Sequence, residues 1–247
     1  MLRGIYTAAS GMLAQGIRTD VLANNLANVD TSGYRRQTAQ VQAFPEQLLM
    51  RQEKMNFTPI GRLGTGTLVV EKHNSFMQGR IHTTGNPLDV ALDGPGFFVI
   101  DTPGQRSYTR DGSFTVNMGG WLVTQDGFRV LGQNGPIYIG EASSVVINSE
   151  GTVIVDGVER DKLLIVEFAD RRGLVNQGGN RYHATPAAGQ PFRWRASVVQ
   201  GALEMANVNT VKEMVNLIEV QRAYEANQKV IQAFDETLGK LINEVKV

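Results

Sequence analysis

The sequence has 247 residues, with 24 basic and 24 acidic side chains, a formal net charge of zero and no cysteine. This length suffices for one large or two small folded domains. The balanced charge leaves no basic stripe for binding nucleic acid, and the lack of cysteine excludes disulfides, cysteine-ligated zinc and thiol catalysis. No apolar run approaches the roughly 20 residues that span a membrane, so no membrane insertion is expected.

The first segment, residues 2–29, is predicted to be a helix because its apolar positions recur at alternating spacings of three and four. It has no continuous apolar run of the kind found in a signal peptide, so no cleaved signal is expected. The helix is predicted to end near residues 30–33, where Gly33 can adopt a positive φ. Small residues, among them Gly11 and Gly16, predict close contact with a neighbouring helix. The periodic series is Ile5, Ala8, Met12, Gln15, Thr19, Leu22, Leu26 and Val29.

The next segment, residues 34–66, is predicted to be a connector. Residues 45–50 favour a short helical piece within it. A polar stretch follows, with Pro59 and three glycines, which is typical of a connection whose conformation depends on its partners.

Residues 67–205 are predicted to form an antiparallel all-β domain rich in hairpins, because short β-branched runs alternate with Asp-Gly and Gly-Gly turns. No strand–helix–strand alternation occurs, which argues against a nucleotide-binding α/β sheet. An aromatic group that includes Phe97, Phe98, Tyr108 and Phe114 is expected in the core. The predicted strands are residues 67–71, 88–92, 97–100, 121–124, 145–147, 152–155 and 163–168.

The last segment, residues 206–247, is predicted to be a second helix, with Thr210 as its N-cap and Glu213 completing a capping box. One apolar seam follows a heptad pattern, which drives helices to wrap around one another. A second stripe lies beside it, so we expect neighbours on more than one side. The seam is Met214, Leu217, Gln221, Tyr224, Gln228, Ile231, Asp235, Leu238, Ile242 and Val245. The second stripe is Val220, Ala223, Val230, Phe234 and Leu241.

Enzyme chemistry has little support. The three histidines, His73, His82 and His183, lack the spacing of metal ligands. Most of the aspartates in the β segment precede glycine or lie in turns, where they form local hydrogen bonds. We therefore expect no catalytic residue, no cofactor and no metal. The short basic pairs are expected on turns and edges, with a subunit contact through Arg193 or Arg195 as an alternative.

Four motifs resemble signatures of the bacterial flagellar rod and hook proteins, and they run in order along nearly the whole chain. They are residues 23–35 (ANNLANVDTSGYR), residues 85–98 (GNPLDVAL followed by GPGFF), residues 108–127 (YTRDGSF, then LVT and DG) and residues 200–227 (QGALE, then QRAYEAN).

The resemblance implies an axial protein of the flagellum that polymerises into a hollow helical tube. Its terminal helices would pair as coiled coils lining the inner tube, with the β domain outside. It also implies export as an unfolded chain by the flagellar type III apparatus, partners among copies of itself and other rod and hook proteins, and a place in the basal body within the cell envelope. The chain is short for a hook protein, which favours a rod protein of the proximal or distal type.

The sequence therefore predicts a mainly β protein with terminal helices that pair as a coiled coil. Its segments are 1–33, 34–66, 67–205 and 206–247. The predicted function is a structural, non-enzymatic subunit of the flagellar rod. The alternatives are a hook or other axial subunit, or a binding module whose helices form only an intrachain stalk. The expected interface residues are Ile5, Met12, Leu22, Asn25, Leu26, Asn28, Met214, Leu217, Gln221, Tyr224, Ile231, Leu238 and Ile242.

Overall fold

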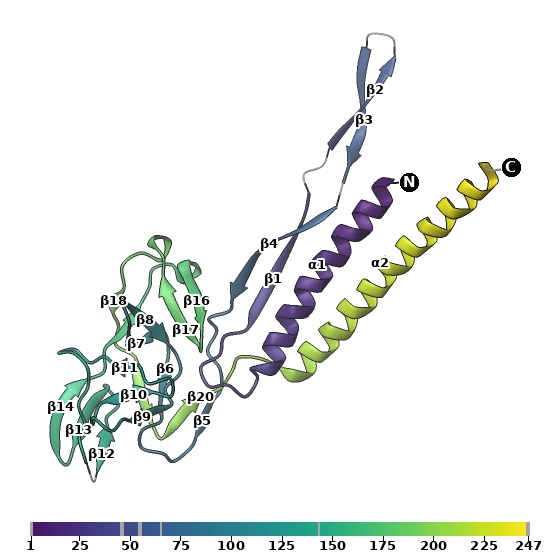
Figure 1. Ribbon diagram of the computed structural model, residues 1–247. Coiled ribbons are helices and arrows are strands. Elements are labelled where there is room, and N and C mark those ends of the chain that lie inside the picture. The colour runs from purple at the N-terminus through teal and green to yellow at the C-terminus, as the bar shows by residue number, and fades with distance from the viewer. Residues whose placement is uncertain (1, 45–46, 54–55, 65, 143, 246–247) are drawn as a thin grey trace. The chain divides into compact units, whose positions relative to one another are not determined.

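The computed structural model describes residues 2–44, 47–53, 56–64, 66–142 and 144–245 (Figure 1). This part of the chain is mostly strand, with an α-helix near each end, which confirms the predicted fold class. It divides into two compact units. We call Met1–Ala27, Gln37–His73 and Asn209–Val247 the helical unit, and Asn28–Arg36 and Asn74–Val208 the β domain.

The helical unit contains α1 (Leu2–Ala27) and α2 (Thr210–Val245), which lie side by side (Figure 1). Gly4 faces Phe234 and Gly11 faces Asn227. A step of seven residues toward the C-terminus of α1, from Gly4 to Gly11, thus corresponds to a step of seven residues toward the N-terminus of α2, from Phe234 to Asn227. The pair is therefore antiparallel, and its contacts repeat with the heptad period expected of coiled helices.

The N-cap of α2 is Asn209, so the prediction of Thr210 was wrong by one residue. The Asn209 side-chain oxygen accepts a hydrogen bond from the Lys212 N–H at 3.0 Å. Asparagine is at least as good an N-cap as threonine, since its oxygen satisfies a backbone donor that the first turn leaves free.

The connector forms strands. β1 (Gln37–Ala43) pairs with β4 (Thr67–Asn74), and β2 (Gln47–Glu53) pairs antiparallel with β3 (Asn56–Leu63). The predicted short helix at residues 45–50 is therefore wrong for 47–50, while 45 and 46 lie outside the described residues. The backbone pairing with β3 overrides the local helical preference of these residues.

The β domain is built around a nine-stranded antiparallel sheet. Its main path runs through β16 (Leu174–Gly178), β17 (Arg181–Ala184), β8 (Gln105–Thr109), β7 (Phe97–Thr102), β11 (Arg129–Val130), β10 (Leu122–Thr124) and β9 (Phe114–Val116). β15 (Ile165–Glu167) also pairs with β7, and β18 (Phe192–Arg193) pairs with β15.

Smaller antiparallel sheets complete the β domain. They are β12 (Val145–Ile147) with β13 (Thr152–Val155) and β14 (Val158–Lys162), β19 (Ser197–Gln200) with β6 (Val90–Asp93), and β20 (Ala202–Glu204) with β5 (Ile81–Thr83). Two short 3-10 turns are η1 (Arg171–Gly173) and η2 (Pro186–Ala188). Each of the seven predicted strands overlaps an observed strand.

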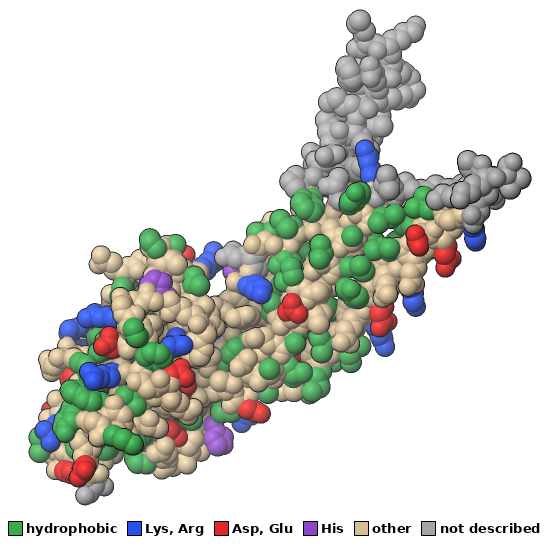
Figure 2. Space-filling view, in the orientation of Figure 1, with side chains coloured by type: hydrophobic (Ala, Val, Ile, Leu, Met, Phe, Trp, Pro, Cys, Tyr) green, Lys and Arg blue, Asp and Glu red, His purple; other side chains and the backbone are tan. Residues whose placement is uncertain are grey.

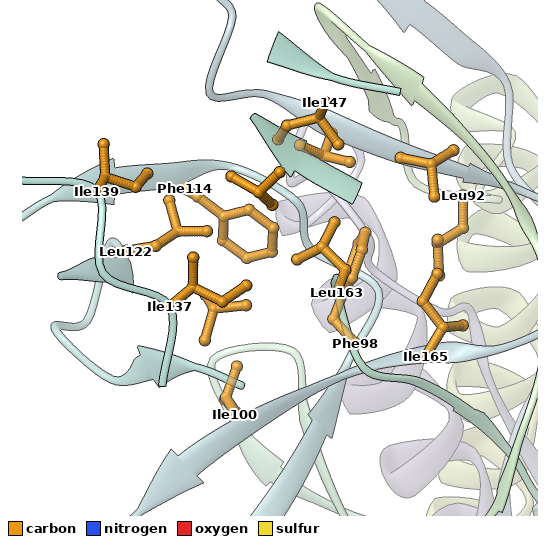
Figure 3. Close-up of a cluster of buried hydrophobic side chains, with 14 of the residues drawn as sticks. Leu92, Phe98, Ile100, Phe114, Leu122, Ile137, Ile139, Ile147, Leu163 and Ile165 are labelled. Atoms are coloured by element: carbon orange, nitrogen blue, oxygen red, sulfur yellow. The ribbon is translucent and has the colours of Figure 1, made fainter. Parts of the chain in front are cut away.

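The core of the β domain is aromatic and aliphatic, as the sequence predicts (Figure 3). Phe98 is fully buried and meets Phe114 edge-on, with ring centroids 5.2 Å apart. Phe97 and Tyr108 are buried in a second cluster beside it. Aromatic side chains each bury a large apolar area, so this core contributes much of the stability of the β domain.

Replacing Phe98 by alanine should lower the free energy of unfolding by about 3–5 kcal/mol, because it removes a buried ring and leaves a cavity. Thermal denaturation followed by circular dichroism would measure the loss. Val146→Ala on β12 is the control, since Val146 is 47% exposed. Equal melting temperatures for the two variants would contradict this account of the core.

Candidate assembly interface

The face of α2 that contacts α1 carries part of the second predicted stripe, since Val230 of that stripe is 43% exposed. Val220 is 2% exposed, and Phe234 contacts Gly4. On α1, the buried side chains are Ala8, Ala14, Val21, Leu22 and Asn25. The intrachain pairing therefore centres on the Val220 and Phe234 side of α2 and covers the heptad seam only in part.

The small residues of α1 are only partly explained by this contact. A Cβ added at Gly11 would lie 3.0 Å from the Asn227 amide nitrogen, which is tight packing. A Cβ at Gly16 would meet nothing within 4 Å. Close approach is thus confirmed at Gly11, while Gly16 has no neighbour within the described chain.

The predicted seam of α2 stays largely uncovered by the chain itself. Met214 is 47% exposed, Tyr224 is 41% exposed and Gln221 is exposed. Leu217, Ile231 and Leu238 on α2 are partly buried, as are Ile5, Met12 and Leu26 on α1. The side chain of Ile242 lies outside the described residues.

Further exposed apolar residues lie beside Met214, and they are not among the interface residues predicted from the sequence. Val211 is 72% exposed, Val215 50% and Ile218 49%. We call Val211, Met214, Val215 and Ile218 the α2 apolar patch. Their spacing of three, four and seven places them on one helix face, so the signal was present in the sequence.

The first helix also presents exposed apolar side chains. Tyr6 and Leu13, seven residues apart, are 72% and 71% exposed. Figure 2 shows hydrophobic side chains along the visible face of the helix pair. Exposed apolar surface on a folded protein is a candidate for contact with another molecule.

Two of the expected interface residues have partners inside the chain. Asn25 is fully buried, and its amide both donates to the Gln37 carbonyl and accepts from the Gln37 N–H, each at 2.8 Å. It therefore fastens the start of β1 to α1 within the helical unit. Asn28 accepts a hydrogen bond from the Thr31 hydroxyl at 3.2 Å, in the turn that follows α1.

A buried ionic cluster lies in the β domain. The Glu204 carboxylate accepts hydrogen bonds from Arg35 at 2.7 Å, from Arg110 at 3.2 Å and from the Gly79 N–H at 2.7 Å. Arg35 also donates to the Met77 carbonyl at 2.9 Å. The three charged side chains are at most 3% exposed. We call Arg35, Arg110 and Glu204 the Arg–Glu–Arg cluster.

The cluster holds two cations around one carboxylate, so its charges are unequal. Burial lowers the pKa of Arg110 to about 10, while the nearby Glu204 charge opposes this shift. Arg110 therefore stays protonated at neutral pH. The Phe97 ring lies 5.4 Å from its guanidinium carbon, and the Gly94 carbonyl accepts a hydrogen bond at 2.8 Å. These contacts replace part of the hydration that the cation loses on burial.

Asn207 joins the points where the chain leaves the β domain. Its side-chain oxygen accepts from the Arg36 N–H at 2.7 Å, and its nitrogen donates to the carbonyls of Ser75 and Met77 at 2.8 Å. Arg36, Ser75 and Asn207 each lie within two residues of a boundary between the two units. The side-chain amide of Asn207 thus holds three of the positions at which the chain passes out of the β domain.

The turn after α1 is also held by the β domain. Gly33 has a φ of 67°, as predicted, and a Cβ there would lie 2.4 Å from the Asp111 nitrogen. The Ser32 hydroxyl donates to the Asp111 carboxylate at 2.6 Å. Only glycine fits this position, since both the backbone angle and the space exclude a side chain.

No group of three or more potential metal ligands occurs among the described residues. His73 hydrogen-bonds Gln40 at 2.9 Å, His82 is exposed on β5, and His183 lies on β17.

Three flagellar family models match successive segments of the chain. Residues 5–35 match the flagella basal body rod protein model, residues 91–155 match the flagellar hook protein FlgE/F/G D1 domain, and residues 199–244 match the flagellar basal body rod FlgEFG protein C-terminal model.

Full-length relatives agree with these matches. The flagellar basal-body rod protein FlgG of Borreliella burgdorferi is 36% identical, covering 100% of this chain and 99% of its own. FlgG of Agrobacterium fabrum is 36% identical over 99% and 100%. The chain belongs to the flagellar basal-body rod protein family. The hook-basal body complex protein FlhO of Bacillus subtilis is also similar, at 31% identity over 99% of both chains.

This rod protein is a structural subunit of the flagellar basal body, where the family is located. Family membership also implies partners among other rod and hook proteins. Neither described helix is apolar enough over a sufficient length to cross a membrane. Each of the three matched segments contributes one residue to the Arg–Glu–Arg cluster: Arg35 from the first, Arg110 from the second and Glu204 from the third.

Replacing Glu204 by glutamine should destabilise the β domain of this rod protein by about 3–5 kcal/mol, because two buried arginines lose their counter-charge. Chemical denaturation would measure the change. Asp126→Asn is the matched control. Asp126 is 53% exposed and 3.8 Å from Arg181, so its loss should cost less than about 1 kcal/mol. A Glu204→Gln variant as stable as the control would refute the structural role of the cluster.

Proposed function

We propose that this rod protein polymerises through its two terminal helices into the axial tube of the rod. The interface would comprise the α2 apolar patch, the predicted seam residues of both helices, and Tyr6 and Leu13. The observation that carries the proposal is the α2 apolar patch, whose four side chains are 47% to 72% exposed.

Helix length supports the proposal. α2 has 36 residues and extends about 54 Å, whereas α1 has 26 residues and extends about 39 Å. One antiparallel neighbour covers one side of α2, and the apolar residues on another side remain in water. A helix gains most of its stability in proteins by packing its apolar faces, so the free sides of both helices favour further helices as neighbours.

The residues at the seam suit contacts between identical subunits. Met214 and Tyr224 present large apolar surfaces, while Gln221 and Gln228 lie on the same face. Polar residues in a helical seam cost stability but fix the register and the choice of partner. A tube that transmits torque needs such a fixed register, because subunits that slip past one another would dissipate the applied twist.

We further propose that the chain reaches the rod through the flagellar type III apparatus and that it has no catalytic role. The absence of cysteine supports export as an unfolded chain, since no disulfide has to be reduced beforehand or formed afterwards. The lack of any metal-ligand group among the described residues supports a purely structural role.

Replacing Met214 or Ile218 by lysine should abolish rod assembly, because a charge would be buried between helices. The purified monomer should keep its stability to within about 0.5 kcal/mol, because both side chains are about half exposed. Swimming and the yield of hook-basal bodies, measured in cells whose only copy is the variant, would report assembly.

Lys229→Glu is the control, because Lys229 is an exposed polar residue outside the patch. It should leave assembly and swimming intact. Normal rods built from the Met214→Lys and Ile218→Lys variants would rule out this interface. They would favour the reading in which the two helices form only an intrachain stalk.

A further inference from the structure

A basic groove lies on the β domain, next to the base of the β13–β14 hairpin. Its volume is about 890 Å³. The half-exposed ring of Trp194 contributes apolar surface above the buried Leu163 and Ile165, while Lys162, Arg193 and Arg195 contribute three cations. This combination of an apolar surface and a charged rim is typical of a protein-binding site.

Glu150 also lines the groove and pairs with Lys162 at 3.0 Å. The hydrogen bond from Lys162 lowers the pKa of Glu150 most, and the Arg195 charge adds to this shift. Among the described residues, neither Arg193 nor Arg195 forms a direct ion pair, so the groove keeps an excess of positive charge. Trp194 lies between these arginines and is 40% exposed. Arginine and tryptophan dominate the energetics of protein interfaces, so the groove suits an acidic protein segment.

The opposite end of the same hairpin provides such a segment. Asp156 and Gly157 have φ angles of 51° and 81°, the pattern of a tight type I′ turn. Asp156 and Ser144 exchange two hydrogen bonds of 3.0 Å, which hold the turn. Val158 is 57% exposed and Glu159 is exposed next to it. We call residues 156–160 the hairpin tip.

The hairpin tip is complementary to the groove in charge. It presents two carboxylates and one aliphatic side chain on a turn that is already ordered, so little conformational entropy is lost on binding. Arg160 is the single cation of the tip, and it lies at the bulge between β13 and β14. Acidic side chains are exposed at the end of the β domain formed by β12 to β14 (Figure 2).

The tip and the groove of one chain cannot meet. β13 has four residues, which separates the two ends of the hairpin by about 13 Å. Two complementary surfaces at different places on one chain produce head-to-tail contacts, and repetition of such contacts builds an open helical assembly.

We propose that the basic groove of one copy holds the hairpin tip of a second copy. Arg193 and Arg195 would face the carboxylates of Asp156 and Glu159, and Val158 would pack on the ring of Trp194. This contact would link the β domains of neighbouring subunits. It rests on the proposed polymerisation and adds to the helices a second interface on the outer domain.

Charge reversal tests the contact in cells that carry only the variant. Arg195→Glu and Glu159→Arg should each lower the yield of hook-basal bodies about tenfold, because each places like charges together. The double variant, with the charges exchanged, should recover most of that yield. Purified monomers should melt as the unaltered protein does, since both residues are exposed.

Arg160→Glu is the matched control on the same tip. It changes the charge by the same amount as Glu159→Arg but makes the tip more acidic, so it should not lower the yield. An equal loss from Arg160→Glu, or a double variant no better than the single variants, would overturn the proposal.

A cysteine pair gives a direct readout, because the chain has no cysteine of its own. Val158→Cys and Ser197→Cys place one thiol on the tip and one at the groove. Mild oxidation of hook-basal bodies should yield a ladder of linked copies, and neither single variant should do so. The two thiols of one chain are too far apart to pair with each other.

No ladder, or a link to a different protein, would overturn the proposal by showing that a second copy does not occupy the groove. If the polymerisation proposal itself is wrong, the Met214→Lys variant should form normal rods. If no ladder forms and the Met214→Lys variant also fails to assemble into rods, the groove contact is rejected and the helical interface is retained.

Discussion

The organisation of this rod protein follows from one constraint: α2 has apolar residues on more than one side, and the chain supplies one helix to cover them. The Val220 and Phe234 side is covered by α1, while the α2 apolar patch stays in water. The β domain has its own buried core and needs no such help. Hydrophobic burial therefore closes the core of the β domain within one chain but leaves part of the apolar surface of α2 exposed, which is the basis of the proposed assembly.

Within the β domain, the Arg–Glu–Arg cluster holds together three chain segments that are far apart in sequence. A buried ion cluster contributes little net stability compared with apolar residues of the same volume, but removing one member is costly. Its value here is specificity: Arg35 and Glu204 are 169 residues apart in sequence and lie close to the points where the chain leaves the β domain for β1 and for α2. With Asn207, the cluster sets where those exits leave the β domain, and each of the three family segments provides one of its charges.

Much of the fold was predictable because it depends on local rules. Asp-Gly turns such as Asp156-Gly157 mark hairpins, and heptad spacing marks both helices. Three features escaped prediction for physical reasons. Residues 47–50 favour a helix but form a strand because they pair with β3. Asn209, and not Thr210, supplies the side chain that caps α2. Arg35 and Arg110 contact their partners only after the chain has folded. The α2 apolar patch was visible in the spacing of Val211, Val215 and Ile218, but periodicity alone does not say which stripe the chain covers itself.

The most direct test of the central claim is maleimide labelling of single-cysteine variants, for which the cysteine-free chain is well suited. Met214→Cys places a thiol in the α2 apolar patch, and Val220→Cys places one in the intrachain helix contact. If assembly covers this face, the Met214→Cys thiol should react in the monomer and be protected in purified hook-basal bodies. The Val220→Cys thiol should be protected in both. Equal reactivity of the Met214→Cys thiol in monomer and basal body would contradict the claim that assembly covers this face.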